Sequence, residues 1–219
     1  MARGADAATA TRQAGYRSRS LAQVNLSGYR SVNAVVDTMA ARYCEALTDA
    51  RLTDAGVHQE GASVWILLAS PFEPPAQANA ASVAAEVLAR VNQARALPRR
   101  CGGDSFGAAP PLRANVALER AAAAHAQDMA RHGYLDHQGR DGSSPADRAS
   151  RAGYNWRSVG ENIASGQPTA AEVVAGWLRS PGHCANIMQP GFSEMGVAFA
   201  VNQASEAGIY WAQTFGRPR

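Results

Sequence analysis

The spacing of apolar residues predicts four amphipathic helices in the C-terminal two thirds of the chain. Val83, Val87 and Val91 recur every four residues within 81–97, which places them on one helical face. The other three predicted helices are recognised from their ends, because each follows a residue that can cap a helix. These helices follow Asn115, the serine before Pro145, and Thr169, and the first two end at Gly133 and Gly153.

Two β-strands are predicted near the C-terminus. In 194–201 and 208–215, apolar residues occupy almost every second position, which is the period of a strand with one buried face. Helices gathered around a few mostly antiparallel strands form an α+β fold.

The N-terminal third of the chain has a different pattern. Residues 1–20 are rich in Arg, Ser, Ala and Gly without periodicity, which predicts a disordered basic arm. In 21–75, valines at helical spacing are followed by two strand-like runs around a glycine turn, which predicts a helix and a hairpin. The prolines of "SPFEPPAQANA" predict a linker at 76–82, so the main domain is expected to span 83–219.

Composition is typical of a globular protein and argues against nucleic-acid binding. Hydrophobic residues make up 46% of the chain and charged residues 18%. The net charge of +3 comes from the arginines of the first 20 residues, and no basic stripe is interleaved with aromatic residues. The longest strongly apolar run, 64–69, is too short to cross a bilayer about 30 Å thick. The first 20 residues also lack the apolar segment of a secretory signal.

Four histidines and one glutamate are candidates for chemistry. His125 and His132 lie on the apolar face of a predicted helix, where a hydrogen-bonded core histidine is the favoured interpretation. His137 lies in a loop and His183 at the start of a short helix, where functional groups concentrate, although a turn-stabilising role is also open. The intervals that separate His137, Glu161 and His183 match no compact metal motif, so spacing alone shows no site.

Other kinds of site have no motif in the chain. It has no G-x-S-x-G elbow, no P-loop and no cysteine in a nucleophile motif, which argues against a serine hydrolase, a nucleotide-dependent enzyme, a thiol protease and an organic cofactor. Cys44, Cys101 and Cys184 show no C-x-x-C spacing, so a zinc knuckle is not expected. Their odd number allows one disulfide and one free thiol.

Four ordered motifs lie between residues 83 and 219. They are A-x-x-H-x-x-D-M-A, D-H with a following D-G-S-x-x-x-D-R, G-E-N-I-A, and S-P-G-H. Together they resemble the CAP superfamily of cysteine-rich secretory, antigen 5 and pathogenesis-related proteins, in particular its bacterial SCP-like extracellular branch. The resemblance implies a three-layer α-β-α sandwich and an extracellular or cell-envelope location, although no export signal is visible in this chain.

The resemblance also implies that His137, Glu161 and His183 line one ligand cavity. Two imidazoles can bind Zn²⁺ or another divalent ion, so His137 and His183 are the implied metal ligands. Eukaryotic family members usually carry a second glutamate three residues after the helix tryptophan, whereas here that position after Trp177 is Ser180. This departure weakens a metal site, and it weakens a two-carboxylate hydrolytic mechanism more.

Three functions are open at this point. The favoured one is a secreted or envelope-associated binding module for a divalent metal ion, a small ligand or a lipid, because no protein nucleophile is evident. The second is a metal-dependent, peptidase-like hydrolase in which His137 and His183 hold the ion and Glu161 is the base. The third is a structural envelope protein with a vestigial cavity. The sequence names neither a ligand nor an oligomeric state.

The same branch of the family implies a disulfide between Cys101 and Cys184, which would leave Cys44 as a buried free thiol. Cys44 is the rival partner for Cys101, because residues 40–72 weakly echo the spacing of 180–215, with Cys44 in the place of Cys184. A persistent disulfide requires an oxidising compartment, which agrees with export.

Overall fold

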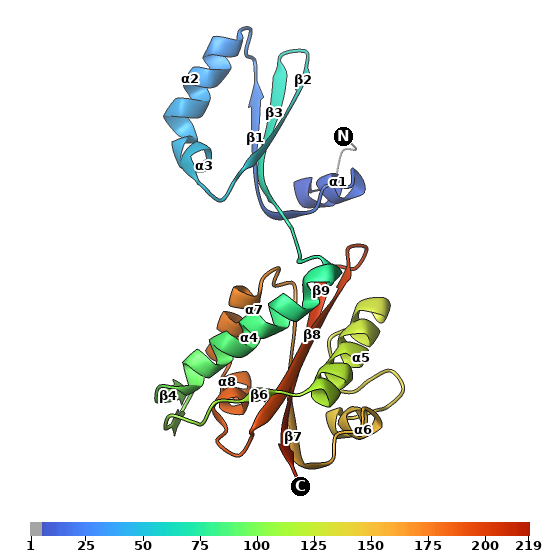
Figure 1. Cartoon of the computed structure of the whole chain (residues 1–219). Helices are drawn as coiled ribbons and strands as arrows, with labels where there is room; N and C mark the ends of the chain where they lie inside the picture. Colours follow the sequence, from blue (N-terminus) through green and yellow to red (C-terminus); the bar gives the residue numbers. More distant parts are fainter. Residues whose placement is uncertain (1–5) are drawn as a thin grey trace. The chain divides into compact units, whose positions relative to one another are not determined.

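The computed structural model describes residues 6–219, and the chain divides into two compact units, Met1–Glu73 and Pro74–Arg219 (Figure 1). The boundary lies within the proline-rich segment, as is usual for a boundary between domains. The predicted linker at 76–82 lies after this boundary and is largely helical, with a 3-10 turn at Gln77–Asn79 and helix α4 at Ala80–Arg95. Its alanines favour a helix once the prolines have been passed.

The first unit is an antiparallel sheet covered by short helices. Strands β1 (Ser18–Ser27), β2 (Asp54–Glu60) and β3 (Ser63–Pro71) lie in the order β1-β3-β2. Helices α2 (Val32–Arg42) and α3 (Cys44–Thr48) connect β1 to β2. The core of this unit forms where Met39 of α2 packs with Val24, Leu26, Val64, Ile66 and Leu68 of the sheet. The expected helix and hairpin are therefore present, together with a first strand that was not predicted.

The predicted disordered arm is wrong for its described part. Residues 1–5 lie outside the described residues, but helix α1 spans Ala7–Gln13, with the Asp6 side chain accepting a hydrogen bond from the Thr9 amide. β1 begins at Ser18 and pairs with β3 about fifty residues later. Local composition could not show this strand, because its serines and arginine acquire β structure only through that distant partner.

The second unit is a sheet between two layers of helices. Its strands are β6 (Arg113–Ala114), β7 (Trp156–Ser165), β8 (Glu194–Asn202) and β9 (Gly208–Pro218), in the order β6-β8-β9-β7. β9 pairs antiparallel with both β7 and β8, and β6 pairs parallel with β8. Strand β7, which carries Glu161, was not predicted and forms one edge of the sheet.

The helices of this unit confirm the predicted three-layer arrangement. Helices α5 (Val116–His132) and α6 (Pro145–Arg151) pack together, and α5 lies on β8 and β9. Helices α4, α7 (Ala170–Arg179) and α8 (Pro181–Met188) form the other layer (Figure 1). No helix among residues 6–219 combines the length and the apolar character needed to cross a bilayer.

The predicted starts of three helices and the end of α5 are confirmed, while α6 ends at Arg151, before the predicted Gly153. The Asn115 side chain accepts hydrogen bonds from the amides of Ala117 and Leu118, and α5 ends at Gly133, whose φ of 67° suits glycine. Ser144 forms a capping box with Asp147, and the Thr169 side chain accepts from the Glu172 amide. These local contacts set where α5, α6 and α7 begin.

The disulfide between Cys101 and Cys184 is present, with the two Cα atoms 5.4 Å apart. It joins the short hairpin of β4 (Arg99–Cys101) and β5 (Asp104–Phe106) to α8, the helix that carries His183. Cys44, the rival partner, is a free cysteine of the first unit. Its predicted burial is wrong, because it lies exposed at the start of α3.

Candidate functional site

Glu161 is a buried carboxylate at the edge of the sheet, and both of its oxygens have partners. Only 2% of its side chain is exposed. Oε1 lies 2.9 Å from Nδ1 of His137, and Oε2 accepts a hydrogen bond of 2.8 Å from Nη2 of Arg148. The structure therefore brings two predicted site residues, His137 and Glu161, into direct contact.

Arg148 of α6 fixes this contact from the interior. Its Nη2 donates to the backbone carbonyl of His137 at 2.9 Å as well as to Glu161, and its Nη1 donates to the carbonyl of Ser143 at 2.7 Å. A guanidinium presents its donors in a rigid plane. Arg148 therefore fixes two groups relative to each other. One is the loop that carries His137, and the other is the Glu161 carboxylate that contacts the His137 ring.

His125 supports the same loop from α5. It is buried, and its Nε2 donates to the carbonyl of Asp136 at 2.8 Å. Burial lowers the pKa of His125, so the ring is held in its neutral form. The prediction of a hydrogen-bonded core histidine is thus confirmed for His125. It is wrong for His132, which lies exposed in the last turn of α5, with Nδ1 2.9 Å from Oδ1 of Asp128.

His137 presents an oriented imidazole to solvent. About half of its side chain is exposed (52%). The hydrogen bond to Glu161 is the main cause that raises the pKa of His137. In the neutral ring this bond places the proton on Nδ1 and leaves the lone pair of Nε2 available. The chain thus offers a nitrogen ligand at a defined place.

His183 lies in α8, which packs beside strand β7. Burial is the main cause that lowers the pKa of His183, and the charge of His137 lowers it further. Two asparagines hold α8 against β7 at this point. Nδ2 of Asn162 donates to the carbonyl of His183 at 3.2 Å, and Nδ2 of Asn186 donates to the carbonyl of Glu161 at 3.1 Å.

The donor set for a metal ion is small. Among residues 6–219 there is no group of three or more His, Cys, Asp or Glu side chains placed to hold an ion together. Glu161 already contacts His137 and Arg148 with its two oxygens. Metal binding by His137 and His183 therefore stays a prediction at this point.

Sequence reasoning missed Arg148, Asn162 and Asn186. Arg148 stands in the D-G-S-x-x-x-D-R motif and Asn162 follows Glu161 in G-E-N-I-A, so the motifs contained a signal for both. Their function as buried hydrogen-bond donors depends on contacts between distant segments, which a motif does not specify. Nothing in the sequence distinguished Asn186 from a surface residue of a short helix.

Comparison with known proteins places the second unit in a family. Residues 88–215 match the model of the cysteine-rich secretory protein family (CAP). The chain is 40% identical over 105 residues to protein YkwD of Bacillus subtilis (strain 168). This alignment covers 48% of this chain and 39% of YkwD. It is 30% identical over 73 residues to membrane protein YlbC of the same strain, covering 33% of this chain and 21% of YlbC. The match thus spans less than half the length of either relative.

A solved structure supports the fold. The crystal structure of an extracellular protein containing a SCP domain, from Bacillus anthracis strain Ames, superposes with a TM-score of 0.53 at 18% identity. The superposition covers 78% of this chain and 62% of that one. Since the family model also matches more than half of the sequence, the protein belongs to the cysteine-rich secretory protein (CAP) family.

Proposed function

We propose that the second unit is a binding module of the cell exterior in which His137 and His183 hold a divalent metal ion. The observation that carries this proposal is the 2.9 Å contact between Nδ1 of His137 and Oε1 of Glu161. Histidine ligands of metals almost always donate their second ring N–H to a carboxylate or carbonyl, which fixes the tautomer and makes the free nitrogen more basic. Imidazole nitrogen suits Zn²⁺ well.

The composition of the site suits a weakly held ion with open positions. Two imidazoles would occupy two positions, and water or an anionic group of a ligand would occupy the others. Glu161 acts by orienting His137, since its oxygens are already in contact with that ring and with Arg148. When bound, the ion would supply a Lewis-acid centre that accepts a carboxylate or similar group.

The contacts of Glu161 favour a binding module over a metal-dependent hydrolase. A general base must be free to accept a proton from water, whereas both oxygens of Glu161 are already in contact, one with His137 and the other with Arg148. The residue three positions after Trp177 is Ser180, so that position supplies no second carboxylate. A structural protein with a vestigial cavity would not need an oriented His137.

A groove on the same unit supports lipid binding as a second candidate function. A cavity of about 190 Å³ lies along β8 between α4 and α5 and is lined mainly by apolar residues, among them Ala84, Leu88 and Val197. Apolar lining favours an acyl chain. Ala84→Phe would fill this groove, while Ala89→Phe on the exposed side of α4 is the matched control. If Ala84→Phe alone loses binding of a fluorescent fatty acid, the groove is supported as the lipid-binding site. Equal binding by both variants would exclude the groove as that site.

The location we propose is extracellular or in the cell envelope. The Cys101–Cys184 bond is buried and connects the β4–β5 hairpin to α8, and such bonds persist in oxidising compartments. The family description names secretory proteins, and the B. anthracis structure is of an extracellular protein. Both facts agree with this location.

Elemental analysis tests the metal proposal. The protein would be purified without chelator, and its metal content compared among wild type, the double variant His137→Ala/His183→Ala, and the control His132→Ala. The proposal predicts a divalent metal in wild type and control but not in the double variant. Equal metal content in all three would contradict it. Peptide hydrolysis that is lost in the double variant alone would favour the hydrolase instead.

A further inference from the structure

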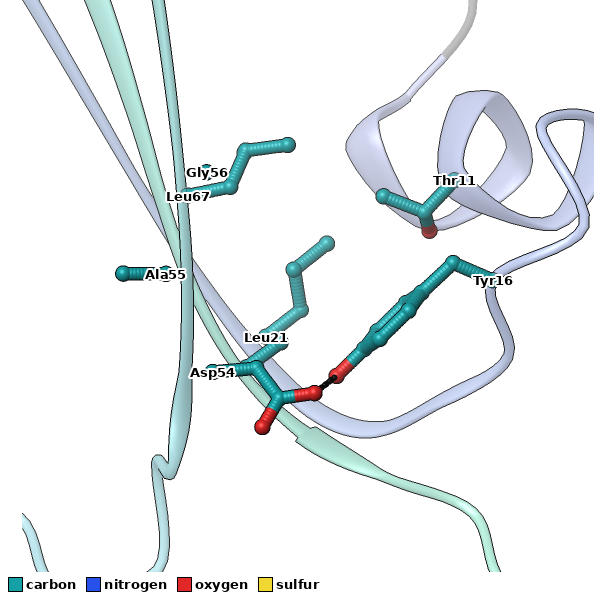
Figure 2. A pocket seen from close by; sticks show the side chains of 8 residues that line it. Thr11, Tyr16, Leu21, Asp54, Ala55, Gly56 and Leu67 are labelled. Atoms are coloured by element: carbon teal, nitrogen blue, oxygen red, sulfur yellow. Dashed lines mark hydrogen bonds between the residues drawn. The ribbon is translucent and has the colours of Figure 1, made fainter.

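The first unit contains a cavity on the face of its sheet that is turned away from α2 and α3. Its volume is about 460 Å³, which lies within the range of small-molecule sites. Figure 2 shows Leu21 of β1 and Leu67 of β3 directed into the space beside α1, with Thr11 and Tyr16 on the opposite side. The register places Leu21 opposite Ala69, which also lines the cavity.

The cavity exists because α1 covers this face without filling it. The helix has the sequence AATATRQ, and none of its residues is buried. Leu21 and Leu67 are each only partly buried. An apolar molecule that covered them would remove further apolar area from water, which favours binding.

The polar groups at one end of the cavity are free to accept hydrogen bonds. Tyr16 donates its hydroxyl proton to Oδ2 of Asp54 at 2.9 Å (Figure 2). Thr53 donates to Oδ1 of Asp54 at 3.1 Å. A carboxylate oxygen accepts more than one hydrogen bond, so Asp54 retains acceptor capacity. Thr11 donates its proton to the carbonyl of Ala8, which leaves its hydroxyl oxygen as an acceptor as well.

One carboxylate lies at this end of the cavity. Of the described residues that line the cavity, Asp54 is the one with a formal charge. Burial and the bond to Asp54 raise the pKa of Tyr16 to about 12, and the charge of Glu73 acts in the same direction. Tyr16 therefore remains a neutral donor to Asp54 at physiological pH, and the carboxylate is oriented by its neighbours.

We propose that this cavity binds a small organic cation with an apolar body, such as an arylalkylammonium. Its ammonium group would donate to Asp54, and its body would lie against Leu21 and Leu67. Hydrogen bonds between charged partners are about twice as strong as neutral ones, so the charge decides which ligands bind. This site lies within the first unit and is independent of the metal proposed for the second.

Calorimetry with three related probes tests the chemistry of the ligand on the full chain. The probes are 2-phenylethylammonium, the uncharged 2-phenylethanol, and the anion 3-phenylpropionate. We expect the ammonium to bind at least about tenfold more tightly than the alcohol, because hydrogen bonds to charged groups are stronger than those between neutral groups. The anion should give no heat. Equal binding of alcohol and ammonium, or no heat from millimolar ammonium, would overturn the proposal.

Two substitutions and a control test the place of binding. Gly56 of β2 lines the cavity, and a Cβ there would meet no atom within 4 Å, so Gly56→Leu should fill the space and abolish binding. Asp54→Asn keeps an acceptor for Tyr16 and removes the charge, and it should weaken ammonium binding at least about tenfold. Val57→Leu is the matched control, because Val57 is 69% exposed and does not line the cavity.

The pattern across the variants decides the outcome. Binding that survives in Gly56→Leu, or Asp54→Asn that binds as tightly as wild type, would place the ligand elsewhere and refute the site. Far-UV circular dichroism checks that each variant is folded. If Gly56→Leu fails to fold, Asp54→Asn alone still decides, since it changes one atom of an exposed residue.

Discussion

Nδ1 of His137 lies 2.9 Å from Oε1 of Glu161, while the other carboxylate oxygen contacts Arg148. A buried anion therefore stands between a half-exposed imidazole and a buried guanidinium. The same guanidinium also donates to the backbone carbonyl of His137. Substitutions at Glu161 or Arg148 should therefore change the pKa or the orientation of the His137 ring, although the ring itself is not mutated.

Replacing Glu161 should lower the pKa of His137. The hydrogen bond to Glu161 is the largest cause of the raised pKa, so Glu161→Gln should move it down, toward or below the usual value of about 6.5. The imidazole signals followed by NMR against pH give the measurement. Glu119→Gln on the exposed side of α5 is the matched control. An unchanged pKa for His137 in Glu161→Gln would contradict the contact.

Acid should destabilise the second unit through His125. Burial lowers the pKa of His125 in the folded protein. At a pH between the folded and the unfolded pKa, His125 is therefore protonated in the unfolded chain but neutral in the folded protein. The contribution of His125 to stability is therefore complete above about pH 6.5 and decreases as pH falls toward the folded pKa. Urea unfolding at pH 7.5 and 5.5 should show a smaller loss of stability in His125→Gln than in wild type. The same loss in both proteins would exclude His125 as the cause.

Removing the guanidinium of Arg148 should destabilise the second unit strongly. Arg148→Met leaves the carboxylate of Glu161 buried beside His137 without its cation, and breaking a buried ion pair in this way costs about 3–5 kcal/mol. The double variant Arg148→Met/Glu161→Gln should recover part of the lost free energy of unfolding, which denaturant unfolding would measure. Arg151→Met on the same helix removes an exposed ion pair with Asp141 and should have little effect. Similar losses from both arginines would contradict the account.

The disulfide should contribute measurably to stability. Cys101 and Cys184 are 83 positions apart, and the chain-entropy model gives about 4–5 kcal/mol for a loop of that length. The double variant Cys101→Ala/Cys184→Ala should lose stability of that order in thermal unfolding. In wild type without reductant, a thiol reagent should detect Cys44 alone. A count of three thiols would show that the bond does not form in solution.

Much of the second unit could be predicted because its signals are local. Caps at Asn115 and Thr169, the stop at Gly133 and the alternation in the last two strands each act within a few residues. Strand β7 was missed because its glutamate and asparagine interrupt the apolar alternation. Those polar residues are buried only because His137, Arg148 and α8 supply their partners.

In the first unit the sequence was a poorer guide. α1 and the first residues of β1 were taken for a disordered arm, since their polar residues gain structure from pairing with β3 and from the cap at Asp6. The cavity beside α1 could not be predicted either. It depends on which residues of β1, β2 and β3 share a face, and that register is set by contacts far along the chain.

If His137 and His183 bind a divalent ion with Glu161 as the orienting carboxylate, zinc calorimetry should detect it. Wild type, His137→Ala and the control His132→Ala would be titrated with Zn²⁺ at pH 7.5 and again at pH 5.5. Neutral imidazole is the ligand, so we predict one weak site at pH 7.5 that is lost at pH 5.5, absent from His137→Ala and retained in His132→Ala. Zinc binding that persists in His137→Ala, or its absence from wild type at pH 7.5, would contradict the account.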